Sequence, residues 1–144
     1  MRDPTGIELI AVEFDCGRQR IILASVYRTG NIQKDKDLFL EYLTNWMAEI
    51  GPSCNRLVLT GDMNFDALTK SDYPFDNTCE VFKLKQWINT VTHKERAIDL
   101  LFTGSLVTLQ KFGLSSPIEN YHKEVFAHIE MTGKKTTITS WARL

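Results

Sequence analysis

The chain has 144 residues, a length that favours one domain, and its 43% hydrophobic and 10% aromatic content excludes disorder over most of the chain. Lys and Arg total 17 against 18 Asp and Glu, and this net charge of −1 excludes a strongly basic, salt-driven nucleic-acid coat while leaving room for a local phosphate site. No apolar run approaches the roughly 18 residues of a membrane span, so we expect no membrane insertion.

Two strands and a turn are predicted at the start of the chain. Residues 7–14 (IELIAVEF) and 20–27 (RIILASVY) are apolar runs of strand length, and Gly17 lies between them in a turn signal. We expect these strands to form an antiparallel hairpin.

A helix and a third strand follow. Residues 35–50 carry one broad apolar stripe at helical spacing, which Gly51 and Pro52 end, and this stripe indicates core packing rather than a cofactor site. Residues 56–60 (RLVLT) then predict a short buried strand. The strand–helix–strand order favours a parallel crossover, in which functional sites gather at the carboxyl ends of the strands.

The second half predicts one more helix and three more strands. Residues 65–77 lack periodicity and indicate a loop, and residues 78–89 predict a helix with Thr78 at its N-cap. Residues 97–103 and 106–114 predict strands paired with each other around Gly104, and residues 124–131 predict the last strand. The whole is an α/β domain over residues 1–131 with a polar tail over 132–144.

The N-terminus and the cysteines indicate a reducing compartment. The opening MRDPTGIELI lacks the apolar region of a signal peptide, so we expect an intracellular protein that is not secreted. Cys16, Cys54 and Cys79 are widely spaced and include no CxxC pair, which predicts free thiols rather than disulfides or a thiolate zinc site.

A G-D-x-N segment ends the third predicted strand. Asp62 can orient or deprotonate water, and Asn64 can donate a hydrogen bond to a phosphate oxygen. If the extended conformation continues, alternation places both on one side. Asp and Asn are also common turn formers after strands, so the motif alone leaves a purely structural interpretation open.

Asp99 lies inside an apolar strand (AIDLLF), where an unpaired charge costs several kcal/mol. His122, just before the last strand, is the natural partner, because a carboxylate fixes the tautomer of an imidazole. His128 is interpreted as structural, and His93 either contacts phosphate or has no role. Tyr27, at the end of the second strand, is either a rim residue or a phosphate ligand.

These motifs, taken in order, resemble the endonuclease/exonuclease/phosphatase superfamily, and most closely the apurinic-like endonuclease domain of non-LTR retrotransposon proteins. That subgroup shows a V-Y-R strand end, a G-D-F-N motif, a threonine followed by a basic residue, an I-D-hydrophobic strand and a terminal S-D-H. The matching positions here are Tyr27-Arg28, residues 57–64, Thr92, residues 98–102 and His122.

The resemblance implies a DNase I-like four-layer α/β sandwich and Mg²⁺-dependent hydrolysis of phosphodiesters in DNA. By analogy, Asp62 activates the attacking water, Asn64 and Tyr27 hold the phosphate, and His122 stabilises the developing charge while Asp99 orients it. The family also implies a nuclear location.

Two departures from the family pattern lead us to expect impaired activity. The family's first half, with an Asn and a metal-binding Glu, has no counterpart in this sequence, and Tyr121 stands where the family has a metal-binding Asp. Because Mg²⁺ prefers carboxylate and water oxygens, we expect weakened Mg²⁺ binding. Without the first half, a sheet edge and an apolar face are exposed, so we expect marginal stability, self-association or a covering partner.

Two alternatives to an endonuclease stay open on the sequence. One is a non-catalytic remnant that acts as a binding or interaction module. The other is a phosphatase of the same superfamily that acts on lipid or sugar phosphates. The near-neutral charge is compatible with all three.

Overall fold

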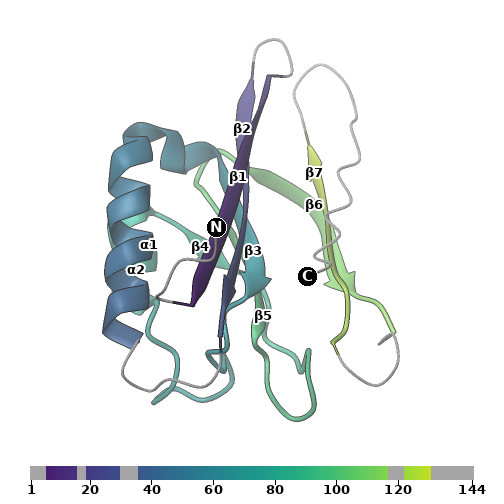
Figure 1. The fold of residues 1–144 in the computed structure, drawn as a ribbon. Helices are drawn as coiled ribbons and strands as arrows, with labels where there is room; N and C mark the ends of the chain where they lie inside the picture. Colours follow the sequence, from purple (N-terminus) through teal and green to yellow (C-terminus); the bar gives the residue numbers. More distant parts are fainter. Residues whose placement is uncertain (1–5, 16–18, 30–35, 117–121, 131–144) are drawn as a thin grey trace.

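A hairpin opens the fold, as predicted. The structure is a computed structural model that describes residues 6–15, 19–29, 36–116 and 122–130 (Figure 1). Strand β1 (Ile7–Asp15) pairs antiparallel with β2 (Arg20–Arg28) over nine residue pairs, from Ile7 opposite Arg28 to Asp15 opposite Arg20.

The parallel crossover is also confirmed. Helix α1 (Lys36–Ile50) is followed by the 3₁₀ helix η2 (Gly51–Arg56) and by β3 (Leu57–Asp62), which pairs parallel with β2. Helix α1 buries Phe39, Leu43 and Met47, which recur every four residues and so lie on one face of the helix.

The second helix is shorter than predicted. Helix α2 (Asp76–Phe82) begins before Thr78, which is buried within it rather than capping it. It ends at Lys83, which adopts a left-handed backbone (φ 56°) while the Leu84 N–H donates to the Cys79 carbonyl. The following residues extend into the two-residue strand β4 (Lys85–Gln86), so the prediction of a helix to residue 89 was wrong.

The predicted pairing of residues 97–103 with 106–114 was wrong as well. Strand β5 (Asp99–Thr103) pairs antiparallel with β3 and β4, giving a five-stranded sheet in the order β1-β2-β3-β5-β4. Strand β6 (Thr108–Leu114) instead pairs with β7 (Val125–Glu130) in a separate two-stranded sheet. The chain therefore changes sheets after Gly104 rather than turning back on itself.

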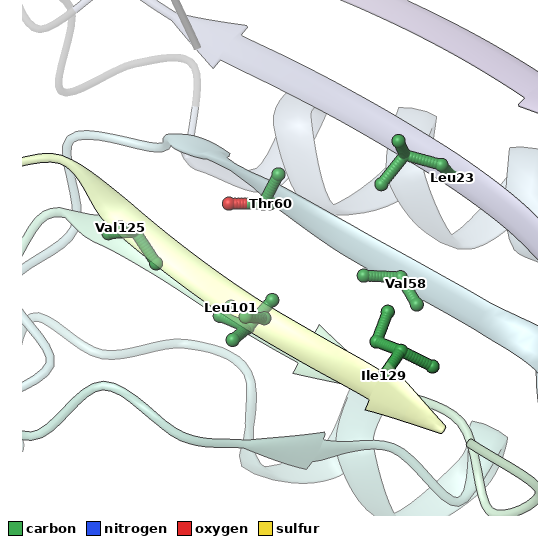
Figure 2. Close-up of a pocket in the computed structure, with 7 residues that line it drawn as sticks. Leu23, Val58, Thr60, Leu101, Val125 and Ile129 are labelled. Atoms are coloured by element: carbon green, nitrogen blue, oxygen red, sulfur yellow. The ribbon is translucent and has the colours of Figure 1, made fainter. Parts of the chain in front are cut away.

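The described residues form three layers. Figure 1 shows α1 and α2 on one face of the five-stranded sheet and β6–β7 on the other. Leu23, Val58 and Leu101 of the large sheet meet Val125 and Ile129 of β7 around a cavity of about 10 Å³ (Figure 2). This arrangement confirms the predicted C-terminal part of an α/β sandwich, with three of the four expected layers formed by the described residues. No helix in the described part of the chain is long and apolar enough to span a membrane.

Gly61 is required where β3 passes β2. Its backbone has φ +147°, and a Cβ at this position would lie 1.8 Å from the carbonyl oxygen of Val26. No side chain fits such an approach to backbone, so the glycine sets how closely the end of β3, with Asp62, packs against β2.

Substituting Gly61→Ala is expected to destabilise the fold by more than about 3 kcal/mol, because it adds a clash with the Val26 carbonyl to an unfavourable φ. Gly51→Ala is the matched control: Gly51 also has positive φ (54°), but nothing lies within 4 Å of its added Cβ. We expect a cost of about 1–2 kcal/mol there. Urea unfolding of both variants measures the difference, and equal costs contradict the packing argument.

An exposed apolar row runs along the edge strand β1. Ile10, Val12 and Phe14 alternate on one face and are 68%, 46% and 38% exposed. Val12 lies opposite Leu23, which faces the second sheet. The row therefore continues, beyond β6–β7, the apolar face that those strands cover.

The double variant Ile10→Thr/Val12→Thr is expected to lower self-association, because it removes apolar surface from an open strand edge. Val81→Thr/Leu106→Thr is the matched control, since Val81 and Leu106 are 61% and 57% exposed but lie outside β1. Sedimentation velocity across a concentration series measures the effect. An unchanged association constant in the β1 variant contradicts a role for this row.

Candidate active site

Three of the predicted site residues meet at one end of the large sheet. Asp62 at the end of β3 is paired directly opposite Asp99 at the start of β5. His122 lies just before β7 and reaches both carboxylates. Ligand atoms of these three residues lie within 4.8 Å of one another, and we call them the Asp/His cluster.

The predicted partnership of Asp99 and His122 is confirmed. Nδ1 of His122 lies 2.8 Å and 3.0 Å from the two carboxylate oxygens of Asp99. Because an ionised carboxylate only accepts hydrogen bonds, Nδ1 carries the proton and donates it. The other ring nitrogen, Nε2, then faces Oδ2 of Asp62 at 3.8 Å, which is beyond hydrogen-bond distance.

The surroundings of Asp62 make it a stronger base than an ordinary aspartate. Burial, and then the negative charge of Asp99, raise its pKa from 3.8 to about 6, although His122 and the Asn64 N–H act in the opposite direction. That N–H donates to Oδ1 at 3.1 Å. A carboxylate with a pKa of about 6 is ionised at neutral pH and close to the value that suits a general base.

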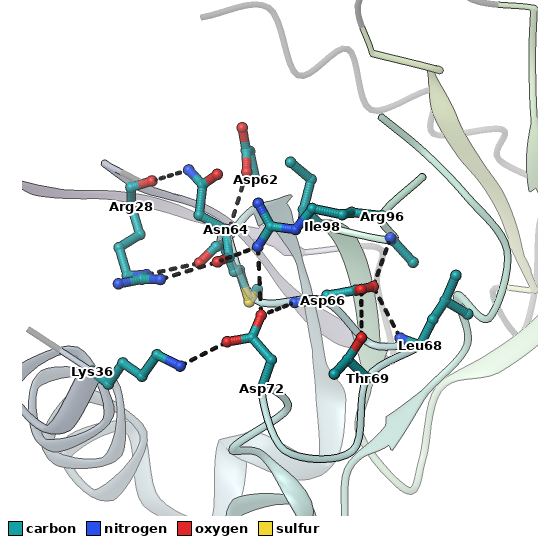
Figure 3. A network of polar contacts seen from close by, with 12 residues as sticks. Arg28, Lys36, Asp62, Asn64, Asp66, Leu68, Thr69, Asp72, Arg96 and Ile98 are labelled. Atoms are coloured by element: carbon teal, nitrogen blue, oxygen red, sulfur yellow. Dashed lines mark hydrogen bonds and ion pairs between the residues drawn. The ribbon is translucent and has the colours of Figure 1, made fainter. Parts of the chain in front are cut away.

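Asn64 lies beside Asp62, but not by strand alternation. The strand ends at Asp62 and Asn64 is left-handed (φ 53°), so the extended geometry that the sequence argument required is absent. The side-chain amide of Asn64 instead donates to the Arg28 carbonyl at the end of β2. Figure 3 shows the side chains of Asp62 and Asn64 on the same side of this loop.

Arg28 supports the loop that follows Asp62, a role that the sequence did not predict. It is 4% exposed, and its guanidinium donates to the carbonyls of Met63 (2.9 Å) and Asn64 (3.0 Å) while lying 3.9 Å above the Phe65 ring. The Asn64 side chain donates in return to the Arg28 carbonyl, so the two residues are joined by hydrogen bonds in both directions. The Tyr27-Arg28 pair is visible in the sequence as a strand end. Only the structure shows that the Arg28 side chain is buried and donates to the loop after Asp62.

A second layer of charged residues supports the same loop, as Figure 3 shows. Buried Asp66 accepts hydrogen bonds from the N–H groups of Ala97 and Leu68; although burial alone raises its pKa, these donors and Thr69 lower it overall. Asp72 accepts from the Asp66 N–H and pairs with Lys36 at 2.7 Å. These internal contacts hold the loop after Asp62 in place.

Thr92 and His93 hold the other side of the cluster. Oγ1 of the fully buried Thr92 accepts the N–H groups of Ile98 and Asp99, both at 3.1 Å. The His93 ring stacks on His122 with centroids 4.3 Å apart. The alternative that His93 contacts phosphate stays a prediction, whereas its stacking on His122 becomes visible only when residues 93 and 122 are brought together.

Tyr27 lies on the same face of the sheet as the cluster. The parallel pairing of β2 with β3 ends at Ser25 and Thr60, and Tyr27 lies two residues beyond Ser25, so strand alternation places its side chain on the same face as Ser25. The role of Tyr27 stays a prediction. Tyr121, Cys16 and the tail over residues 132–144 lie outside the described residues; Cys54 and Cys79 are free thiols.

The donor set of the cluster suits a divalent cation. Two carboxylates facing each other repel, and after burial the charge of Asp99 is the second cause of the raised pKa of Asp62. A cation between them relieves this repulsion. Mg²⁺ is commonly held by one or two carboxylates together with water and phosphate oxygens. Asp62 and Asp99 fit that pattern, and His122 adds an imidazole nitrogen that also suits Mn²⁺ or Zn²⁺.

Replacing Asp99→Asn is expected to lower the pKa of Asp62 from about 6 while leaving it above 3.8, because the neighbouring charge disappears but burial, the larger cause, remains. In the native chain the raised pKa means that the folded state holds a proton the unfolded state has lost, so stability falls as pH rises from 3.8 toward about 6. Carboxyl ¹³C NMR titration measures the pKa. Exposed Asp37→Asn serves as control, and an unchanged Asp62 titration in Asp99→Asn contradicts the coupling.

Solved structures of other proteins have a fold similar to this one. The sequence matches no protein-family model and has no significant match among curated proteins. The structure is similar to the endonuclease domain of TRAS1, a telomere-specific non-LTR retrotransposon, with a TM-score of 0.70, 16% identity and coverage of 86% of this chain and 64% of that domain.

Two proteins of Bacteroides thetaiotaomicron are also similar. An endonuclease/exonuclease/phosphatase family protein has a TM-score of 0.57 at 17% identity, covering 83% of this chain and 50% of that one. A mannosyl-6-phosphatase has a TM-score of 0.52 at 18% identity, covering 72% and 46%. The expected fold is thereby confirmed, and this chain spans at most 64% of these three neighbours.

Proposed function

We propose that this chain belongs to a metal-dependent phosphodiesterase that cleaves DNA, an endonuclease of the retroelement type. The observation that carries the proposal is the convergence of Asp62, Asp99 and His122, which come from distant points in the sequence, at one end of the sheet. The fold shared with the TRAS1 endonuclease domain supports it.

Asp62 is the proposed general base. Its raised pKa of about 6 gives it more basicity than an ordinary aspartate while it stays ionised at neutral pH. The N–H of Asn64 holds one carboxylate oxygen, so the other oxygen, on the side of His122, is the one that accepts a proton from water.

His122 is the proposed electrostatic stabiliser. Asp99 accepts the Nδ1 proton, which leaves Nε2 directed toward Asp62. When the imidazole is doubly protonated, Nε2–H donates to a phosphate oxygen, and Asp99 stabilises the resulting positive charge. Asn64 and Tyr27 are proposed to hold the phosphate from the same end of the sheet.

A bound Mg²⁺ would supply Lewis-acid stabilisation of the phosphate's negative charge. Within the Asp/His cluster, Asp99 would hold it, because the free oxygen of Asp62 is the one proposed to accept a proton. We propose DNA as the substrate and, with it, a nuclear location. The near-zero net charge of the chain means that binding depends on local contacts at this site rather than on a basic surface.

The test is nicking of supercoiled plasmid in Mg²⁺. We expect the wild-type chain to nick the plasmid slowly and only at high Mg²⁺ concentration, since Mg²⁺ binding is expected to be weakened, and we expect EDTA to abolish nicking. Asp62→Ala is expected to lower the rate by at least about 100-fold, because it removes the general base. His122→Ala is expected to lose activity to a similar degree.

Two substitutions distinguish a site effect from a general one. His128→Ala removes an exposed imidazole on β7, and Asp37→Asn removes an exposed carboxylate on α1. Both are expected to nick at the wild-type rate. If wild type and Asp62→Ala nick the plasmid at the same background rate, the nuclease proposal is wrong and a non-catalytic interaction module is favoured.

A phosphatase is the second candidate, since the mannosyl-6-phosphatase shares the fold over 72% of this chain. The same Asp/His cluster would serve a phosphomonoester equally well. Hydrolysis of p-nitrophenyl phosphate or mannose 6-phosphate without plasmid nicking, lost in Asp62→Ala, selects this function over the first.

A further inference from the structure

The turn that contains Thr92 and His93 contacts the segment that contains His122 through a ring and through the backbone. The two imidazole rings are stacked, with centroids 4.3 Å apart and planes inclined by 19°. An antiparallel β-bridge joins the same two residues, and the Lys123 N–H donates to the Thr92 carbonyl at 2.8 Å. Residues 92 and 93 therefore contact both the backbone and the ring of the His122 segment.

The turn is itself firmly held. His93 and Arg96 exchange both backbone hydrogen bonds at 3.0 Å. Fully buried Thr92 accepts the N–H groups of Ile98 and Asp99 through its hydroxyl oxygen. Asp99 is thus positioned by the same turn that presents the His93 ring, so both contacts to His122 originate from one hydrogen-bonded unit.

The hydrogen bond from His122 to Asp99 leaves the His122 ring free to rotate about one axis. It fixes Nδ1, but the ring can still tilt about the line that joins Nδ1 to the carboxylate, and this tilt displaces Nε2. Nε2 is the atom that lies 3.8 Å from Oδ2 of Asp62. A ring stacked on the face of His122 opposes the tilt, because tilting separates the two faces.

We propose that His93 is a positioning residue, whose ring face holds the His122 imidazole in the plane where Nε2 is directed at Asp62. The catalytic consequence rests on the proposed function, whereas the orientation of the His122 ring is a property of this chain alone. The feature that acts is the flat ring of His93, so another aromatic side chain replaces it and a polar side chain without a ring does not.

NMR of the His122 ring tests the positioning without any assay of activity. We expect a hydrogen-bonded Nδ1–H signal and ring-current-shifted ring C–H signals for His122 in wild type and in His93→Phe. In His93→Gln, which keeps polarity and approximate size, we expect the Nδ1–H signal to persist, because Asp99 still accepts it, and the nuclear Overhauser contacts between the His122 ring and Asp62 to weaken as the ring tilts. Unchanged contacts between the His122 ring and Asp62 in His93→Gln, or their loss in His93→Phe, overturn the proposal.

Plasmid nicking tests the catalytic consequence. We expect His93→Gln to lower kcat about 10- to 100-fold with KM changed less than about twofold, while His93→Phe retains most of the wild-type kcat. His128→Ala controls for loss of an imidazole elsewhere, and thermal melting of each variant establishes that it folds.

The outcomes separate the two proposals. Equal loss of kcat in folded His93→Phe and His93→Gln means that the polarity of His93 acts rather than its ring, which overturns the positioning role. Absence of nicking in the wild type, together with the expected NMR signals, defeats the proposed function and supports the positioning of His122.

Discussion

Two carboxylates placed face to face in adjacent strands impose the main constraint on this molecule. Asp62 and Asp99 are paired residues in β3 and β5, and both are half-buried. Like charges at directly opposed positions destabilise a sheet, so the surrounding structure has to compensate. Much of what surrounds the site does so: the Asn64 N–H donates to Asp62, and the His122 ring donates to Asp99.

Contacts from the loops and from the end of β2 hold the two carboxylates in place. Beneath Asp62, Arg28 donates to two carbonyls of the loop and Asn64 donates back to Arg28. Beside Asp99, the buried hydroxyl of Thr92 accepts two backbone N–H groups. Since these contacts are satisfied internally, the fold itself holds the cluster in place, as the proposed electrostatic stabilisation requires.

The fold is retained at low sequence identity because it depends on pattern more than on particular residues. The neighbours share 16–18% of residues with this chain, yet their folds are similar to it with TM-scores of 0.52 to 0.70. Gly61 is an exception, since its closeness to the Val26 carbonyl admits no side chain. Ile10, Val12 and Phe14 of β1 are exposed in this chain. The chain spans 64% of the TRAS1 domain.

Local patterns by themselves determined the hairpin β1–β2, the helix α1, the crossover to β3 and the need of Asp99 for a partner, because each follows from neighbouring residues or from the cost of burying a charge. Only the tertiary structure decided that β6 joins β7 rather than β5, and that α2 ends at Lys83. It also decided that His93 stacks on His122. Strand partners and ring contacts join residues far apart in the chain, and packing, not local preference, selects among them.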